Sequence, residues 1–450
     1  LKRVVDQIRG PKGSTVRLTM IPTGGDGSAR KLVTLVRDEI KLEDGEAKAK
    51  LVEVPDGKGA TRRVGVIDLP SFYANMSVGI GGKGSTRKST TADVAKLIKK
   101  LVAEKAEGII LDLRRNGGGS LPEAVNLTGL FIKTGPVVQV KEFFGRIDQD
   151  DDNDPSVLYD GPLMVLTSRF SASASEIVAG ALQDYGRAIV VGDTTTHGKG
   201  TVQTIQELAP FLPESPLPAG AIKVTIRKFY RASGESTQLK GVVPDLVLPS
   251  VNNFLETGES SLTNALPWDT IAPADFTKLN RVQPFLARLR DHSSNRIAAD
   301  RDWDYVREDV GIFQRKQAEK TLSLNYDQRV RERHEDRERA ERRKKELAAR
   351  GSKEPTAYEI TLKLADQPGL PQPLGKSNVV ATSSADLKLV GKPKPSDAAS
   401  SEKKPKAQSP GPDGEDEDAL PDADAAIDVH LREAERILLD LIRLTKATHA

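Results

Sequence analysis

Cysteine is absent from this chain of 450 residues. Its absence excludes disulfide bonds, thiolate zinc sites and a cysteine nucleophile. Aromatic residues make up only 4% of the chain. No apolar run reaches the roughly 18 residues that a membrane-spanning helix needs. Any chemistry must therefore use Ser, Thr, Lys, His or carboxylate side chains.

The chain also has no large excess of positive or negative charge. The 67 Lys and Arg residues oppose 64 Asp and Glu residues, which leaves a net charge of +3. No basic patch is concentrated enough to predict nucleic acid as a partner. No group of carboxylates has the spacing of metal ligands, so we expect neither a metal nor another cofactor.

Hydrophobic periodicity predicts an α/β core with a partly parallel sheet. A helical pattern at 91–106 precedes a continuous apolar strand at 109–113. A second apolar strand at 162–167 is followed by a helix at 173–185 and a further strand at 188–191. Strands that alternate with helices are typical of parallel sheets covered by helices on their faces.

The remainder of the chain differs in composition from this core. Residues 1–40 predict a short helix and two strands, too few elements for a domain. A highly charged helix at 326–350 is either a solvated surface with i,i+4 ion pairs or a partner-binding surface. The tract at 391–422 predicts a disordered linker, and an amphipathic helix within 423–450 should pack on the body or on another subunit.

The sequence S-A-S-A-S-E at 171–176 lies where an apolar strand turns into a helix. At such a turn the hydroxyl of Ser173 can project from the core, and the amides of the helix N-terminus can face a developing negative charge. Serine is also a preferred helix N-cap, so the residues alone leave a nucleophile and a cap as alternatives.

Lys199 lies between Gly198 and Gly200, 26 residues after Ser173 (199 minus 173). A partly buried ammonium group has a lowered pKa and can act as a general base for a serine. A solvated loop lysine is the alternative. A P-loop is a poor alternative, because Gly200, and not Ser or Thr, follows Lys199, and Asp193 stands where the first glycine would be needed.

A third segment, N-G-G-G at 116–119, follows the strand that ends near Leu113. Glycine loops can point backbone amides at an oxyanion, although a flexible turn explains this segment equally well when it is considered alone.

Taken together, these segments resemble the carboxyl-terminal processing proteases, and specifically the tail-specific protease branch of Gram-negative periplasms. The resemblance implies that Ser173 is the nucleophile, that Lys199 is the general base, and that Gln203 orients this lysine. It further implies oxyanion donors at Gly118, Gly119 and Ala174, and supporting roles for Glu176 and Asp184.

The same resemblance implies a protease core like those of Clp protease and crotonase, with the end of a PDZ domain before it and a mainly helical domain after it. The expected bounds are 1–40 for the PDZ remnant, 41–250 for the protease core, 251–390 for the helical domain, 391–422 for the linker and 423–450 for the amphipathic helix. Because the front of the PDZ domain is missing, we expect an N-terminally truncated chain.

The function implied by the resemblance is serine endoproteolysis by a Ser/Lys dyad. Its substrates would be proteins recognised through apolar, unstructured C-terminal tails. The resemblance implies a periplasmic location, and it allows association with the inner membrane and a periplasmic adaptor lipoprotein as a partner.

Two alternatives remain beside the dyad. His197 lies two residues before Lys199, so a Ser-His-Asp triad with Asp184 is one of them. The other comes from a different class of function: an inactive, truncated homologue that acts as a peptide-binding or scaffold protein.

Overall fold

A computed structural model describes residues 5, 7–21, 30–38, 45–56, 59–74, 88–211, 220–350, 355–374 and 427–448. The chain divides into two compact units. One comprises Leu1–Leu42, Leu324–Ser352 and Gly375–Ile427, and the other comprises Glu43–Ser323, Lys353–Leu374 and Asp428–Ala450. The linker expected at 391–422 lies outside the described residues, and the domain bounds given above stay a prediction.

The first unit contains a hairpin and a charged helix. Strands β1 (Thr15–Met20) and β2 (Lys31–Val36) pair antiparallel, close to the two strands predicted there. Helix α7 (Tyr326–Arg350) has no buried residue. Ion pairs at i,i+3 spacing, such as Arg329–Glu332, run along its surface, as expected for a solvated helix.

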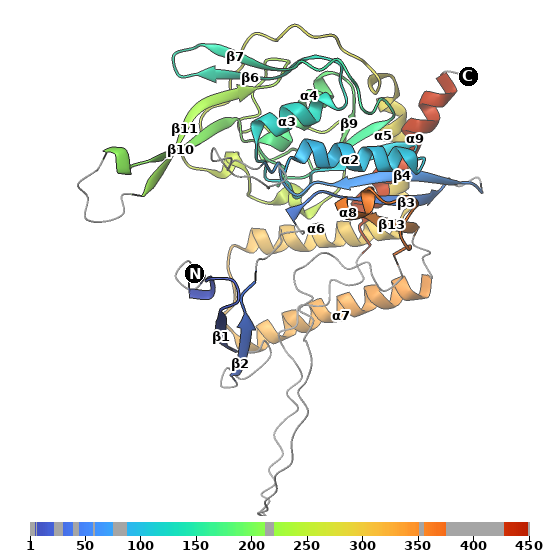
Figure 1. The fold of residues 1–450 in the computed structure, drawn as a ribbon. Helices are drawn as coiled ribbons and strands as arrows, with labels where there is room; N and C mark the ends of the chain where they lie inside the picture. Colours follow the sequence, from blue (N-terminus) through green and yellow to red (C-terminus); the bar gives the residue numbers. More distant parts are fainter. Residues whose placement is uncertain are drawn as a thin grey trace, which may run out of the picture. The chain divides into compact units, whose positions relative to one another are not determined.

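A mixed sheet of seven strands forms the centre of the second unit (Figure 1). Its order is β12 (Leu246–Val247), β9 (Ile189–Gly192), β8 (Leu163–Thr167), β5 (Gly108–Asp112), β4 (Thr61–Asp68), β3 (Lys48–Pro55) and β13 (Thr356–Ile360). The pairs from β12 to β4 are parallel, and β3 and β13 add antiparallel strands at one edge. The mixed α/β fold predicted from the sequence is confirmed.

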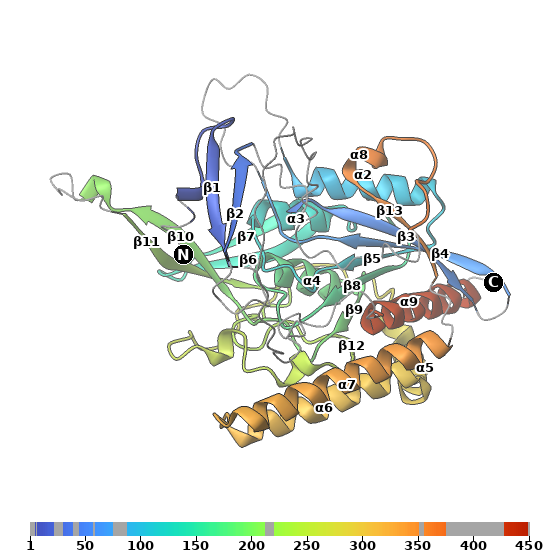
Figure 2. The same cartoon turned by 90° about the horizontal axis from the view of Figure 1, so that it is seen from below.

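Helices cover both faces of this sheet (Figure 2). One face packs against α2 (Thr90–Ala103), α3 (Leu121–Gly129) and α4 (Ala174–Asp184), and the other packs against α5 (Leu286–Ala299), the start of α6 (Arg301–Glu319) and α9 (Val429–Thr448). In β5, Ile109 and Leu111 belong to the first core and Ile110 to the second. A strand buried on both faces must be apolar at every position, which explains its continuous apolar run.

Helix α9 is the amphipathic helix expected near the end of the chain. Its residues Ala434, Ile437 and Leu438 are fully buried against the second face of the sheet. At the start of α9, Asp428 forms an ion pair with Arg114 at 2.7 Å. Arg114 also pairs with Asp112 at the end of β5, so the helix is tied to the loop that follows this strand.

A second sheet, of four antiparallel strands, was not predicted. Its order is β10 (Thr201–Glu207), β11 (Ala221–Tyr230), β6 (Gly135–Glu142) and β7 (Ile147–Asp152). Val138 and Val140 of β6 and Phe229 of β11 join the core that contains α4. The hairpin of β10 and β11 extends away from the main sheet in Figure 1.

Candidate active site

The turn between β8 and α4 holds Ser173 in an uncommon backbone conformation. Its φ is 57° and its ψ is −113°, in a region that costs a residue with a side chain about 1–3 kcal/mol. The Ser173 amide donates to Glu176 Oε2 at 2.7 Å. The Ser173 carbonyl accepts from the amides of Glu176 and Ile177. These bonds hold the strained turn in place at the start of the helix.

Glu176 connects the turn at Ser173 with the loop that carries Lys199, called the lysine loop below. Its side chain is fully buried. It accepts hydrogen bonds from the amides of Ser173 (2.7 Å), Gly198 (2.7 Å) and Lys199 (3.0 Å) and from Thr196 Oγ1 (2.6 Å). Burial raises the pKa of Glu176 to about 7, and these hydrogen bonds act against that rise. The carboxyl group of Glu176 thereby holds together the turn at Ser173 and the loop at 196–199.

Lys199 lies in the loop between β9 and β10, which packs closely against residues 236–241. A Cβ at Gly198 would lie 2.9 Å from the Leu239 carbonyl carbon, and one at Gly200 would lie 2.6 Å from the Gln238 amide nitrogen. The glycines on both sides of Lys199 are therefore required for this close approach.

The Lys199 side chain is half-buried, and burial is the main cause that lowers its pKa. The ammonium group of Lys223 lowers the pKa further, while Glu259 and Glu176 act in the opposite direction. Lys199 Nζ donates a long hydrogen bond of 3.4 Å to Gln203 Oε1. A lowered pKa increases the fraction of neutral amine, which is the form that can accept a proton.

Most of the predicted site residues line one cleft of about 280 Å³. Five of them lie in its wall: Ser173, Ala174, Lys199, Gln203 and Gly119. The other lining residues are Gly117, Leu121, Ile177, Thr201, Val202, Lys223 and Phe229. Segments that are distant in the sequence thus meet around one serine.

The glycine loop offers backbone amides beside that serine. Those of Gly119 and Ala174 make no hydrogen bond to any described residue. The Gly118 amide, in contrast, donates to Asn116 Oδ1 at 2.8 Å. The amides of Gly119 and Ala174 can therefore donate to an acceptor in the cleft, whereas that of Gly118 is already paired.

Gly118 and Gly119 allow the loop to approach its neighbours. Both have positive φ, of 105° and 146°. A Cβ at Gly118 would lie 2.9 Å from Ser173 Cβ, and one at Gly119 would overlap the Phe72 carbonyl. Only glycine fits these two positions without moving the backbone.

Asp184 lies apart from the cleft, at the other end of α4. This helix has 11 residues, so Asp184 and Ser173 are separated by about 16 Å at roughly 1.5 Å per residue. Asp184 pairs with Arg231 at 2.5 Å, and both side chains are largely buried. His197 does not line the cleft. Ser173, His197 and Asp184 therefore do not form a triad here.

Sequence reasoning missed Lys223, the segment 236–241 and the role of the Asn116 side chain within the N-G-G-G motif. Lys223 reaches the cleft because β11 pairs with β10 in a register that sets Lys223 opposite Ile205. Asn116 shapes the glycine loop, since its side chain also donates to the Leu69 carbonyl. A lysine on an exposed part of a strand gives no local signal of such a position.

Within the described ranges, no three His, Asp or Glu side chains are grouped so that they could hold a metal ion. None of the helices in the described part of the chain combines the length and the apolar character needed to cross a membrane.

The mixed α/β core, with a serine at a strand-to-helix turn and a lysine in the same cleft, indicates a peptidase class. Residues 63–248 match peptidase family S41, and residues 253–443 match the C-terminal domain of tail specific protease. The chain belongs to peptidase family S41, within the group that carries this C-terminal domain, which confirms the family inferred from the motifs. The PDZ part of the predicted fold lies outside these matches and stays a prediction.

Individual relatives agree with this assignment. The chain is 40% identical over 339 residues to the tail-specific protease of Haemophilus influenzae, a match that covers 75% of this chain and 46% of the relative. It is 34% identical over 252 residues to the carboxy-terminal-processing protease of Bartonella bacilliformis, covering 55% and 50%. The chain spans about half the length of these curated relatives.

Among solved structures, the photosystem II D1 C-terminal processing protease is 27% identical, with a TM-score of 0.38 over 55% of this chain and 58% of that chain.

Proposed function

We propose that this chain is a serine endopeptidase in which Ser173 is the nucleophile and Lys199 the general base. The observation that carries the proposal is their joint position in one cleft with the unpaired amides of Gly119 and Ala174. Neutral Lys199 takes the proton of Ser173 Oγ, and the oxygen attacks the peptide carbonyl carbon.

The remaining steps use the same groups. The amides of Gly119 and Ala174 stabilise the oxyanion, while Gly118 lets the loop approach Ser173. The ammonium form of Lys199 then gives its proton to the leaving amine, and water releases the acyl group from Ser173. Gln203 accepts a hydrogen bond from Lys199 and directs the amine.

Glu176 and Asp184 have supporting roles in this proposal. Glu176 holds the serine turn and the lysine loop in register through four hydrogen bonds. Asp184 fixes the far end of α4 through its ion pair with Arg231.

The proposed substrates are proteins with apolar, unstructured C-terminal tails, processed or degraded after recognition of the tail. Support comes from the name of the Haemophilus influenzae relative, a tail-specific protease of a Gram-negative bacterium. We extend the proposal to a periplasmic location at the inner membrane and to a periplasmic adaptor lipoprotein. Residues 1–40 are proposed as the end of a PDZ domain.

Cleavage of a protein with an unstructured apolar tail tests the proposal directly. The chain, its Ser173→Ala and Lys199→Ala variants and a Lys133→Ala control are compared at neutral and basic pH. Lys133 is an exposed lysine that does not line the cleft. We expect each site variant to lose about 10²-fold or more in rate, with the control unchanged.

Two results would contradict the dyad. One is full activity of the Lys199→Ala variant. The other is absence of cleavage by the unmodified, folded chain while it still binds the tail, which would favour the peptide-binding alternative.

A further inference from the structure

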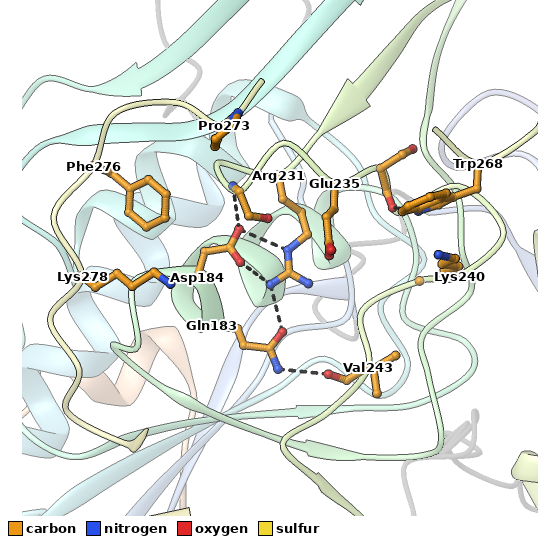
Figure 3. A pocket seen from close by; sticks show the side chains of 13 residues that line it. Gln183, Asp184, Arg231, Glu235, Lys240, Val243, Trp268, Pro273, Phe276 and Lys278 are labelled. Atoms are coloured by element: carbon orange, nitrogen blue, oxygen red, sulfur yellow. Dashed lines mark hydrogen bonds and ion pairs between the residues drawn. The ribbon is translucent and has the colours of Figure 1, made fainter. Parts of the chain in front are cut away.

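A second and larger pocket, of about 570 Å³, lies at the end of α4 remote from Ser173. Figure 3 shows its side chains, which come from the last residues of α4, from 231–243 after β11 and from 268–278. Its volume falls within the roughly 300–1,000 Å³ of ligand pockets. The proposed cleavage uses only its Asp184–Arg231 ion pair, which holds the end of α4, and places no substrate in it.

The floor of this pocket contains polar groups with unused hydrogen-bonding capacity. Arg231 is held by Asp184 through Nε (3.1 Å) and Nη2, and Nη2 also donates to Gln183 Oε1 at 3.0 Å (Figure 3). Arg231 Nη1 makes no hydrogen bond to a described residue. The hydroxyl of Ser233 is buried and has no partner among the described residues. A buried hydroxyl without a partner is unfavourable, and a ligand acceptor would relieve that cost.

The walls combine aromatic surface with positive charge. Lys240 Nζ lies 3.2 Å from the centroid of the Trp268 ring, and Phe276 lies on the opposite wall in Figure 3 with Lys278 beside it. The lining contains three cationic residues (Arg231, Lys240, Lys278) and two anionic ones (Asp184, Glu235), an excess of one positive charge (3 minus 2). This combination suits an apolar ligand that ends in a carboxylate.

The wall segment 236–241 connects this pocket to the lysine loop. Ser236, Lys240 and Gly241 face the pocket. From the same segment, Thr237 Oγ1 donates to the Lys199 carbonyl at 3.0 Å and the Leu239 amide donates to the Gly198 carbonyl at 2.8 Å. Gln238 Oε1 accepts from the Gly200 amide at 2.8 Å.

An occupant that shifts 236–241 must therefore act on the loop that carries Lys199. We propose that this pocket is a second binding site, for an apolar peptide end with a free carboxylate, and that its occupancy alters the Lys199 loop. The choice of a peptide rests on the proposed function, because each cleavage would create a new peptide carboxylate.

Binding can be measured without cleavage in the Ser173→Ala variant of the whole chain. The probe is the peptide acetyl-Ala-Ala-Leu with a free carboxylate, compared by calorimetry with the same peptide as its C-terminal amide. We expect the amide to bind about tenfold or more weakly, since it lacks the charge. Equal binding of the acid and the amide would overturn the proposal.

Three further variants locate the peptide. Combining Lys240→Gln with Lys278→Gln, both at exposed side chains, should weaken binding of the acid about tenfold or more, with Lys133→Gln as the matched control. Lys223→Gln changes the cleft that contains Ser173. If Lys223→Gln abolished binding and the double variant retained it, the peptide would be in the cleft and the second site would be refuted.

Hydrogen exchange tests the connection to Lys199. With the peptide bound, the exchange rates of the amides of Gly198 and Lys199, both bonded to Glu176, should change together with those of 236–241. Unchanged exchange at both amides, with binding intact, would overturn the coupling. Because no readout requires turnover, failure here is distinguishable from failure of the proposed peptidase activity.

Discussion

At the residue scale, the state of Lys199 determines how the proposed activity depends on pH. Burial and the charge of Lys223 lower its pKa from the ordinary value of 10.5. The neutral amine is the base, so kcat/KM should rise as pH increases through this lowered pKa. Replacing Lys223 by Met removes one of the two lowering influences, so the rise should move to higher pH.

A pH profile of kcat/KM for Lys223→Met and for the control Lys133→Met measures this displacement. A profile unchanged by Lys223→Met, or displaced to lower pH, would contradict the assignment of Lys199 as the base.

Glu176 provides the second test at the residue scale. In Glu176→Gln, one of the two acceptor oxygens becomes an amide NH₂ that faces existing donors. The four present hydrogen bonds cannot all be kept, and each buried group left unpaired costs about 1–3 kcal/mol. We expect a lower Tm and a fall in kcat of about tenfold or more, measured by thermal unfolding and steady-state kinetics. Glu207→Gln, at an exposed position on β10, is the control and should behave as the unmodified chain.

At the scale of elements, the glycine loop after β5 offers a comparison between adjacent residues. Gly118→Ala places a Cβ at 2.9 Å from Ser173 Cβ and from the Ala172 carbonyl oxygen, at a φ of 105°. The loop must then withdraw from the serine turn, at a cost of about 1–3 kcal/mol, and the Gly119 amide moves with it. We expect a loss of activity of about tenfold or more.

Gly117→Ala is the matched control for this substitution. A Cβ at Gly117 meets nothing within 4 Å, and its φ is not positive. Kinetics and unfolding of both variants provide the comparison. Equal activity of Gly118→Ala and Gly117→Ala would exclude a role for the close approach of the loop.

The helices and strands also differ in how well they could be predicted from the sequence. The continuous apolar runs of β5 and β8 and the small-residue helix α4 are visible locally, because burial on two faces requires apolar residues throughout. The second sheet was missed although β11 alternates apolar with polar residues as a strand does. Strand β7, with the sequence I-D-Q-D-D-D, has no such alternation. The sheet forms because the hairpin of β6 and β7 pairs through β6 with β11, which is distant in the sequence. Local propensity does not contain this context.

The candidate site, too, could be predicted from the sequence only in part. The positions of Ser173 and Lys199 could be predicted because motifs surround them. The four hydrogen bonds of Glu176 could not, since they depend on how the 196–199 loop folds back over α4. The paired state of the Gly118 amide likewise depends on Asn116, a side chain with no local signature of that role.

At the scale of the whole second unit, its sheet depends on a helix from the end of the chain. Leu438 of α9 is fully buried, and a Cβ at Gly108 in β5 would lie 3.0 Å from its Cδ2. Leu438→Ala should therefore destabilise the fold by about 2–5 kcal/mol through the cavity that it leaves. Leu324→Ala, at a leucine that is 93% exposed, should change the free energy of unfolding by less than about 0.5 kcal/mol.

Denaturant unfolding followed in parallel with peptidase activity connects this destabilisation to the site. Helix α9 covers β5, whose following loop carries Gly118 and Gly119, and Arg114 ties that loop to Asp428. Activity in Leu438→Ala should therefore be lost at the same, lowered denaturant concentration as the fold. If activity survived beyond the unfolding of α9, the glycine loop would be positioned independently of this helix, and the final segment of the chain would not be required to hold the site.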